Sequence, residues 1–318
     1  MTSDRQVVIV STAVDVATDQ VAAGLQQAGV KVTRLNTEDF PFERKLTYQV
    51  GDGVSSLQID GQSLGAPNAI WYRRVRVPKR PLGMDPGIYD FSLRETRAAL
   101  LGGIAAISTR WMSPPANVWR AELKPLQLQV ASGLGLKIPQ TVITNDPDQV
   151  RDAFQVFQAM VAKPVRSGYV VIEGEPHSIY TSRLLEEHMA HLDAASLSPT
   201  IYQELIPKRF DVRVTIVGDR IFAAAIDSQG DKDAEVDWRR TNNPNLGHHS
   251  IDLPAALEHA LRSLMRQLGL SYGAVDLVQT PDGEFVFLEV NPNGQWLWLD
   301  DKLDMGITRE MVNWLSQP

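Results

Sequence analysis

The stretch Ser271–Gly294, SYGAVDLVQTPDGEFVFLEVNPNG, contains two apolar runs separated by a turn sequence. Tyr272–Gln279 and Glu284–Val290 are short, apolar and rich in β-branched and aromatic residues, which is typical of buried strands. The Thr-Pro-Asp-Gly sequence between them is a strong turn signal. We therefore predict an antiparallel hairpin whose strands carry two acids, Asp276 and Glu289, among Val, Leu and Phe.

The length of the hairpin loop decides which face of the sheet these acids share. A loop of two or four residues places Asp276 opposite Phe287, with Glu289 diagonally from Asp276 on the same face. Asn291 continues that face, because side chains repeat every two residues along a strand. A three-residue loop would instead send Asp276 to the opposite face.

Two carboxylates and an amide that converge in an apolar sheet would each cost roughly several kcal/mol of desolvation if they stayed unpaired. All three supply oxygen ligands, and Mg2+ commonly takes one or two carboxylates and completes its shell with phosphate and water oxygens. Pairing of the acids with buried arginines is the alternative. The hairpin by itself leaves both interpretations open.

Bulk composition excludes several classes of protein. The chain has 318 residues, 43% of them hydrophobic, which is enough for a large core and two or three domains. It has no cysteine, which excludes disulfides, thiolate metal sites and any thioester formed on this chain. No apolar run reaches the roughly 20 residues of a membrane helix, and the polar start Met1–Gln6 is unlike a signal peptide, so we expect a cytoplasmic protein. The net charge of -7 argues against nucleic-acid binding.

The order of predicted elements indicates an α/β protein whose C-terminal part is α+β. The β-α-β start, formed by Gln6–Ser11, Thr18–Ala28 and Lys31–Leu35, favours a parallel sheet. A domain boundary falls near Ser113–Asn117, and the last third is rich in strands. Other predicted elements are a strand over Ala69–Val77, hairpins around Gly51–Gly53 and Tyr169–Thr181, and helices over Ser92–Ile107, Asn117–Ser132, Pro147–Met160, Ser182–His191 and Pro254–Leu268.

Three cations lie inside structured segments and could meet the charge of a nucleotide triphosphate. They are Lys124, Lys163 at the end of an apolar strand, and Arg213 in the run RFDVRVTIV. A glycine-bearing segment with Gly168 and Gly174 follows Lys163 and could form a flap, although it matches neither a Walker loop nor a dinucleotide fingerprint. The alternative for a single lysine of this kind is a solvated or snorkelling side chain.

Taken in order, the pieces resemble the ATP-grasp superfamily. A lysine precedes GLKIPQT, a second lysine lies in AKP, the flap follows, and then come YQELI, DVRVTIVGDRIFAAAI and GAVDLV with EFVFLEVNPNG. The sequences VTRLNTEDFP, WYRR, DWR and NPNGQWLWLD resemble, more narrowly, the macrocyclising ATP-grasp ligases, the graspetide synthetases that mature microviridins and related ribosomal peptides. This likeness covers nearly the whole chain.

The resemblance implies an ATP-grasp fold in three parts: an N-terminal pre-ATP-grasp β-α-β domain (residues 1–115), a small central domain with the flap (116–198), and a C-terminal antiparallel-sheet domain with the Mg-ATP site (199–318). ATP and Mg2+ are the implied cofactors. The resemblance assigns Lys124 and Lys163 to the α- and β-phosphates, Gln203, Glu204, Leu205 and Ile206 to the adenine hinge, Asp211 to the ribose side, Arg213 to the γ-phosphate, and Asp276, Glu289 and Asn291 to Mg2+.

The implied reaction activates an Asp or Glu carboxylate of a precursor peptide as an acyl phosphate. A hydroxyl or amine of the same peptide then closes a macrocyclic ester or amide. Cations must bring the two anions together, and Arg213, Arg239, Arg73 and Arg74 are the catalytic candidates. The alternative for Arg73 and Arg74 is a solvated basic edge, and for Arg239 a loop charge.

The partner would be the precursor peptide, leader plus core. By family analogy the leader would dock on the hairpin Tyr169–Thr181 and the helix Ser182–His191. A homodimer is left open. Two other functions also remain open at this point: an ATP-grasp ligase for small molecules or amino acids, and a nucleotide- or leader-binding protein without turnover.

Overall fold

The computed structural model describes residues 5–166, 168–241 and 243–317. The chain divides into two compact units. The N-terminal unit comprises Met1–Pro115, Gln295–Leu297 and Gly306–Pro318, and the large unit comprises Ala116–Gly294 and Trp298–Met305. Two short C-terminal segments thus belong to the N-terminal unit. The further division of the large unit at residue 198 stays a prediction.

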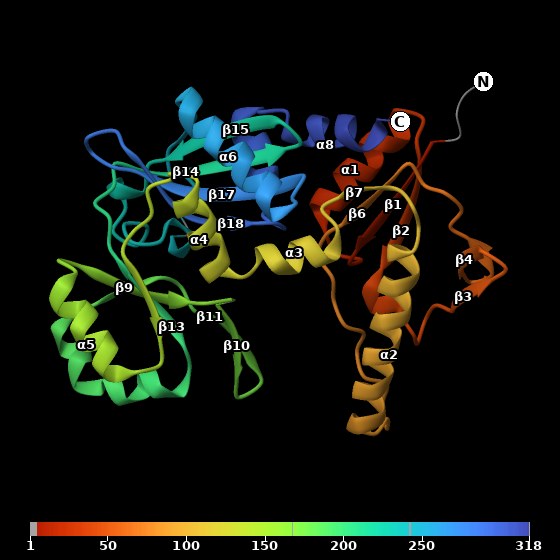
Figure 1. Cartoon of the computed structure of the whole chain (residues 1–318), viewed down its shortest axis with the longest axis horizontal. Coiled ribbons are helices and arrows are strands. Elements are labelled where there is room, and N and C mark those ends of the chain that lie inside the picture. Colours follow the sequence, from red (N-terminus) through yellow and green to blue (C-terminus); the bar gives the residue numbers. More distant parts are fainter. Residues whose placement is uncertain (1–4, 167, 242, 318) are drawn as a thin grey trace. The chain divides into compact units, whose positions relative to one another are not determined.

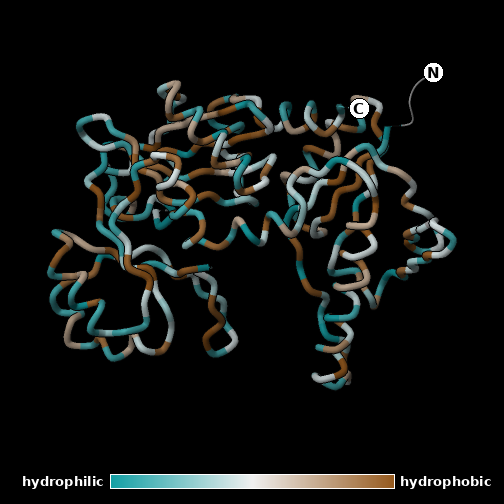
Figure 2. The backbone as a smooth tube through the Cα atoms, viewed as in Figure 1, coloured by the Kyte–Doolittle hydropathy of each residue, from teal (hydrophilic) through white to brown (hydrophobic). Residues whose placement is uncertain are grey.

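A parallel sheet organises the N-terminal unit, as the β-α-β start of the sequence predicts. Helix α1 (Val16–Gln27) connects the first two strands, and the side chain of Asp15 caps it by accepting a hydrogen bond from the Thr18 N–H. Figure 2 shows hydrophobic residues along the strands of this unit. The strand order is β2 (Lys31–Asn36), β1 (Gln6–Ser11), β6 (Ala69–Tyr72) and β7 (Arg110–Met112).

The N-terminal unit also contains a small antiparallel sheet and the C-terminal helix of the chain. The predicted hairpin around Gly51–Gly53 is confirmed, as β3 (Leu46–Gly51) pairs with β4 (Val54–Ile59), which also pairs with β5 (Gln62–Ser63). The predicted strand over Ala69–Val77 is too long, because the chain leaves the sheet after Tyr72. Helix α8 (Ile307–Ser316) packs against α1, where Gly24 leaves room for the side chain of Val312.

Helix α2 (Pro86–Ala105) begins earlier than the predicted start at Ser92. Asp85 caps it, with its carboxylate accepting hydrogen bonds from the N–H groups of Gly87 and Ile88 at 2.8 and 3.2 Å. Pro86 suits the first helical position, where its missing N–H would have had no partner. These two signals move the start of the helix forward. No helix among the described residues is both long and apolar enough to cross a membrane.

The predicted continuous helix Asn117–Ser132 is wrong. It is two helices, α3 (Pro115–Ala121) and α4 (Lys124–Gly133), because Pro125 has no N–H and cannot sit inside a helix without breaking its hydrogen bonding. Asn117 is not a cap: it lies within α3 and its side-chain amide donates to the Gly269 carbonyl at 2.9 Å. The break places Lys124 at the start of α4.

An antiparallel sheet forms the first part of the large unit, and the predicted helix Ser182–His191 is wrong there. Ser182–Leu184 is strand β12, because the edge of β9 offers it a ladder of backbone hydrogen bonds. Figure 1 shows β9 and β13 beside α5. The elements are β12, β9 (Met160–Pro164), β13 (Thr200–Glu204) and β8 (Thr141–Thr144) in that order, with α5 (Pro147–Val156), the 3-10 turns η2 (Glu186–Leu197) and the confirmed hairpin of β10 (Tyr169–Ile172) and β11 (Glu175–Ser178).

A second antiparallel sheet carries the acids, as predicted for the C-terminal part. Helix α6 (Ala255–Leu268) packs on it, and Gly273 lies directly against Met265 of that helix. The 3-10 turns η3 (Ser228–Gly230) and η4 (Trp238–Arg240) lie between β15 and β16, and α7 (Leu297–Leu303) follows the last strand. The order is β16 (His248–Ser250), β15 (Arg220–Ile226), β14 (Phe210–Val217), β17 (Tyr272–Gln279) and β18 (Phe285–Asn291).

A β-bulge sets the register of β17 and β18. Gln279 pairs with Phe285, so the loop between them has an odd number of residues, 280–284. With regular pairing this loop would place Asp276 opposite Leu288 and turn Glu289 to the other face. The register shifts between Asp276 and Leu277, which leaves Leu288 as the extra residue.

The bulge brings the acids closer than predicted. Leu277 pairs with Phe287, but Asp276 pairs directly with Glu289, and Ala274 pairs with Asn291. The predicted placement of Asp276 opposite Phe287 is therefore wrong, while the predicted shared face is confirmed. Two carboxylates that oppose each other directly repel each other more strongly than a diagonal pair would.

The turn that follows β18 requires a glycine. A Cβ atom at Gly294 would overlap the Cβ of Ala274. We expect Gly294→Ala to lower the free energy of unfolding by about 1–3 kcal/mol, measured by urea titration, because the core must shift to admit the methyl group.

Two further variants separate this clash from a general effect. Gly133→Ala, where a Cβ meets open space, should leave stability unchanged or slightly raised. Adding Ala274→Gly to Gly294→Ala removes the overlap and should recover part of the loss, whereas strictly additive losses would contradict the clash.

Candidate functional site

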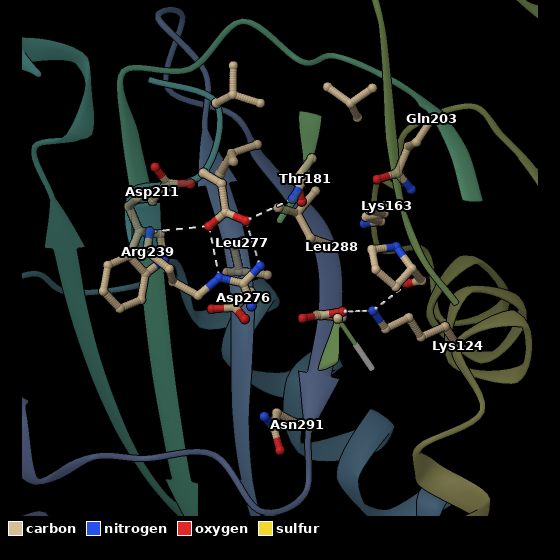
Figure 3. A pocket seen from close by; sticks show the side chains of 18 of the residues that line it. Lys124, Lys163, Thr181, Gln203, Asp211, Arg239, Asp276, Leu277, Leu288 and Asn291 are labelled. Carbon is tan, nitrogen blue, oxygen red and sulfur yellow. Dashed lines mark hydrogen bonds and ion pairs between the residues drawn. The ribbon is translucent and has the colours of Figure 1, made fainter. Parts of the chain in front are cut away.

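A pocket of about 530 Å³ opens on the faces of the two sheets of the large unit. Figure 3 shows Lys124, Lys163 and Gln203 on one side of it and Asp211 and Arg239 on the other, with Asp276 between them. The predicted nucleotide and metal residues that line it are Lys124, Lys163, Gln203, Glu204, Leu205, Ile206, Asp211, Asp276, Glu289 and Asn291, joined by the catalytic candidate Arg239.

Each of the two opposed acids is paired with its own cation. Glu289 Oε2 lies 2.8 Å from Lys124 Nζ, and Asp276 Oδ1 lies 3.3 Å from Arg213 Nε. Arg213 and Asp276 also face each other across β14 and β17 in the backbone register. The structure is therefore compatible with both interpretations of the hairpin. The acids share one face, as a metal site requires, and each also has a basic partner.

The two acids differ in the pKa of their side-chain carboxyl groups. Burial and the Glu289 carboxylate together raise the pKa of Asp276 to about 6, and the charge of Arg213 opposes this rise. Burial also raises the pKa of Glu289, but Lys124 and Lys163 outweigh it and lower that pKa to about 2. Glu289 is thus fully ionised at neutral pH, whereas Asp276, with the higher pKa, is the acid that takes up a proton first as the pH falls.

The donor set fits Mg2+. Among the described residues no cluster of three or more His, Cys, Asp or Glu side chains has the arrangement of a metal site. The oxygen donors here are two carboxylates and the amide of Asn291, which follows Glu289 on the same face of β18. This is the hard oxygen set that Mg2+ prefers when phosphate supplies further ligands.

The two predicted phosphate-binding lysines come from different elements. Lys124, the first residue of α4, donates to the Pro164 carbonyl at 3.2 Å in addition to its pairing with Glu289. Lys163 lies on β9, and burial lowers its pKa to about 8, opposed by the negative charge of Glu289. Both ammonium groups therefore interact with Glu289 of the hairpin, Lys124 by an ion pair and Lys163 through the charge of the carboxylate.

The hinge segment lies at the end of β13. The buried side chain of Gln203 donates to Thr141 Oγ1 at 2.8 Å. The backbone N–H of Leu205 donates to the Ala159 carbonyl at 2.9 Å, and that of Glu204 to Gln140 at the same distance. These two bonds fix the segment to the residues that precede the neighbouring strands β8 and β9.

Three site residues escaped prediction. Lys208 binds both carboxylate oxygens of Asp211, at 2.9 and 2.8 Å, while burial raises the pKa of Asp211 against that charge. Gln127 of α4 fixes the backbone next to Glu289. Its side chain accepts a hydrogen bond from the Val290 N–H at 2.9 Å and donates one to the Val290 carbonyl at 2.8 Å. The three-residue spacing of Lys208 and Asp211 was a usable signal, but nothing local indicates the partner of Gln127.

Asp237 is the third missed residue, and it holds Arg239 in place. Its oxygens accept from Arg239 Nε at 2.8 Å and Nη2 at 2.7 Å. These bonds raise the pKa of the Arg239 guanidinium, and they lower the pKa of Asp237 despite its burial. Asp237 also accepts from the backbone N–H of Thr181 at 3.1 Å, so it joins the end of the glycine flap to the arginine-bearing turn.

The other two catalytic candidates, Arg73 and Arg74, belong to the N-terminal unit. Arg73 is only 1% exposed; its Nε donates to Asp15 at 2.9 Å and its Nη2 to Gln295 at 2.9 Å. Its guanidinium also lies 4.5 Å from the ring centroid of Trp296. Arg74 is exposed. A direct catalytic role for either residue stays a prediction.

Comparison with known proteins assigns the chain to a family. Residues 6–119 match the model of the MvdD pre-ATP grasp domain. The structure superposes on macrocyclase MdnC from Microcystis aeruginosa MRC, solved with its precursor peptide MdnA, with a TM-score of 0.86 and 33% identity over 98% of this chain and 99% of that one. The chain belongs to the ATP-grasp macrocyclases. The resemblance seen in the sequence is thereby confirmed.

Two further relatives outline the family. An ATP-grasp ligase from Chryseobacterium gregarium, solved with ADP and a leader and core peptide, has a TM-score of 0.89 and 26% identity over 98% of this chain and 96% of that one. A probable alpha-L-glutamate ligase of Xanthomonas oryzae pv. oryzae is 29% identical over 221 residues, 66% of this ATP-grasp chain and 70% of the relative. The match to peptide-modifying ligases therefore extends further along the chain.

The buried lysine of this ATP-grasp pocket should make nucleotide binding depend on pH. Since the pKa of Lys163 is about 8, its ammonium form is lost as the pH rises from about 7 to about 9. We expect the affinity for ADP, measured by calorimetry without metal, to fall by up to about ten-fold over that range.

Lys163→Arg is the matched control for this titration, because a guanidinium stays charged throughout the range. Its ADP affinity should vary little with pH. An unchanged pH dependence in the arginine variant would assign the titration to another group.

Asp237 is expected to act on turnover through Arg239. Asp237→Asn keeps the shape but loses the charge that fixes the guanidinium, so ADP formation should fall about 10- to 100-fold. In an Arg239→Ala background the same change should cost little, which a double-mutant cycle measures.

Asp233→Asn, an exposed carboxylate of the same loop, is the control and should turn over normally. Equal losses from Asp237→Asn in the presence and absence of the Arg239 side chain would show that Asp237 acts independently of it.

Proposed function

We propose that this ATP-grasp ligase closes rings in a ribosomal precursor peptide. It would activate an Asp or Glu side-chain carboxylate with ATP and join it to a Ser or Thr hydroxyl or a Lys amine of the same peptide. The observation that carries this proposal is the directly opposed pair Asp276 and Glu289, surrounded in one pocket by basic side chains from separate elements. Lys124, Lys163 and Arg239 line this pocket, and Arg213 pairs with Asp276 from β14.

Asp276, Glu289 and Asn291 are the residues that would hold Mg2+, which supplies charge neutralisation at the phosphates when bound. The protein's own contribution is a set of fixed cations. Lys124 and Lys163 would hold the α- and β-phosphates, and the hinge from Gln203 to Ile206 would hold the adenine. Asp211, paired with Lys208, would lie on the ribose side.

The reaction requires two anions to approach each other. A carboxylate oxygen of the peptide bonds to the γ-phosphorus as the bond to the bridging oxygen of ADP breaks, and ADP leaves. The hydroxyl or amine then attacks the acyl carbon, loses its proton, and inorganic phosphate leaves. Arg213 and Arg239 would stabilise the charge on the transferred group, so positioning and electrostatics supply the acceleration.

Arg213 is suited to this role because its guanidinium is not fully used within the protein. It is buried, and its Nε and Nη1 atoms make no hydrogen bond to the described residues beyond the 3.3 Å ion pair with Asp276. Its guanidinium lies 5.8 Å from the ring centroid of Trp238, a residue that lines the pocket. A buried donor without a partner is costly, and a phosphate oxygen would satisfy it.

A small-molecule ligase is the second candidate, supported by the partial match to the probable alpha-L-glutamate ligase. The peptide interpretation has more support, since the macrocyclase MdnC, solved with a precursor peptide, matches along 98% of the chain. A binding protein without turnover is disfavoured by the complete set of charged pocket residues. The proposed cellular location is the cytoplasm, where ATP and the newly synthesised precursor peptide are available.

The test incubates the enzyme with Mg-ATP and a precursor peptide encoded beside its gene. Mass spectrometry should show loss of one water for each ring, with equimolar ADP. Glu289→Gln should reduce ring formation by about 100-fold or more while the protein stays folded, because it removes a charge from the phosphate site and hardly alters packing.

The matched control is Glu284→Gln, which neutralises an exposed acid paired with Lys137 in the loop just before the same strand. It should form rings normally. Ring formation at the wild-type rate by the Glu289 variant, with magnesium as the metal, would refute the proposed site.

A further inference from the structure

The segment Arg74–Arg80, RVRVPKR, is a concentration of positive charge in an acidic protein. It holds Arg74, Arg76, Lys79 and Arg80 and no acid, while the whole chain carries a net charge of -7. All four cations are exposed. The segment follows β6, so it begins at the carboxyl end of a parallel strand, where α/β sheets place their ligands. We call it the basic strip.

The backbone of the basic strip is held in place at two points. Thr37 Oγ1 donates to the Arg76 carbonyl at 2.8 Å and accepts from the Arg76 N–H at 2.9 Å. Pro78 is buried, and its carbonyl accepts a hydrogen bond from the Tyr89 hydroxyl of α2. An exposed segment anchored in this way is ordered before any ligand arrives, which lowers the entropy cost of binding.

The cationic side chains, in contrast, are not used within the fold. Across residues 5–166, 168–241 and 243–317, none of the four cations of the strip forms an ion pair within 4.0 Å. Their neighbour Arg73 shows the difference, since it is buried and bonded to Asp15. Arg76 lies close enough to Glu38 to lower the pKa of that carboxyl, whose Oε1 accepts hydrogen bonds from Thr12 and from the Ala13 N–H.

The strip also has an apolar side. Val75 and Val77 alternate with the arginines and are 42% and 69% exposed. Apolar and cationic side chains thus occupy alternate positions of the chain from Arg74 to Val77, and all four are exposed. This pattern suits an extended peptide that mixes carboxylates with apolar residues.

We propose that the basic strip binds an acidic, extended part of the peptide substrate. This inference rests on the proposed function, because a peptide whose reactive groups are Asp and Glu side chains is the partner that four unpaired cations would attract. Guanidinium groups bind carboxylates through two parallel hydrogen bonds, which gives orientation as well as attraction. Nucleic acid is the less suitable partner, because it would extend well beyond the strip along a chain whose net charge is -7.

Fluorescence anisotropy tests the strip without any need for turnover. The probe is a fluorescein-labelled peptide of alternating Glu and Thr residues, with an alternating Lys and Thr peptide and a 20-nucleotide single strand of DNA as the comparison ligands. Arg74→Ala with Arg76→Ala, and Lys79→Ala with Arg80→Ala, are the two test variants. We expect both to weaken Glu-Thr binding, with about a ten-fold loss when the four changes are combined, and to reduce its salt dependence.

The control variant combines Lys31→Ala with Arg94→Ala, two exposed cations of the same unit outside the strip. It should bind the probe like the unmodified protein. Thermal melting confirms that every variant folds, since exposed substitutions change stability little.

Any of four results would contradict binding of an acidic peptide by the strip. Two concern the variants: the combined variant binds the Glu-Thr peptide as the unmodified protein does, or the control variant loses as much affinity as the combined variant. Two concern the ligands: the DNA binds more tightly than the Glu-Thr peptide, or the Lys-Thr peptide binds as tightly as the Glu-Thr peptide. Failure of the proposed function is separate. In that case no rings form with the precursor, while the strip variants still differ from the control in binding the acidic probe.

Discussion

The direct opposition of Asp276 and Glu289 across β17 and β18 is the constraint on which the large unit depends. Two carboxylates in an apolar sheet repel each other and lose their hydration, so each requires a compensating positive charge. The bulge at Leu288 creates this opposition, because it restores the shared face that the odd loop length would have removed. The rest of the pocket is arranged around the two acids.

The compensating cations come from segments far apart in the chain. Lys124 begins α4, Lys163 lies on β9, and Arg213 faces Asp276 from β14. Each element contributes one charge, so the site forms only when both sheets of the large unit and α4 are folded. These cations balance the two acids within the protein, which stabilises the pocket before any ligand binds, and in the proposed function the same cations would hold the phosphates.

Arginines that look alike in the sequence have opposite roles in the N-terminal unit. Arg73 is buried among Asp15, Gln295 and Trp296, and it binds the segment that follows β18. Arg74 and the cations after it are exposed on an anchored backbone. One residue stabilises the fold, while its neighbours form a surface suited to an acidic peptide.

The sequence by itself determined the fold class, the N-terminal β-α-β arrangement, the C-terminal antiparallel sheet and the identity of most charged pocket residues, because these follow from local periodicity and from motif order. It could not determine the register of β17 and β18, the break between α3 and α4, or the strand at Ser182–Leu184. Nor could it show that Asp237 binds the guanidinium of Arg239, or that Gln127 binds the backbone of Val290 beside Glu289. These features depend on which backbone edges and buried charges meet in space, and only the tertiary structure decides that.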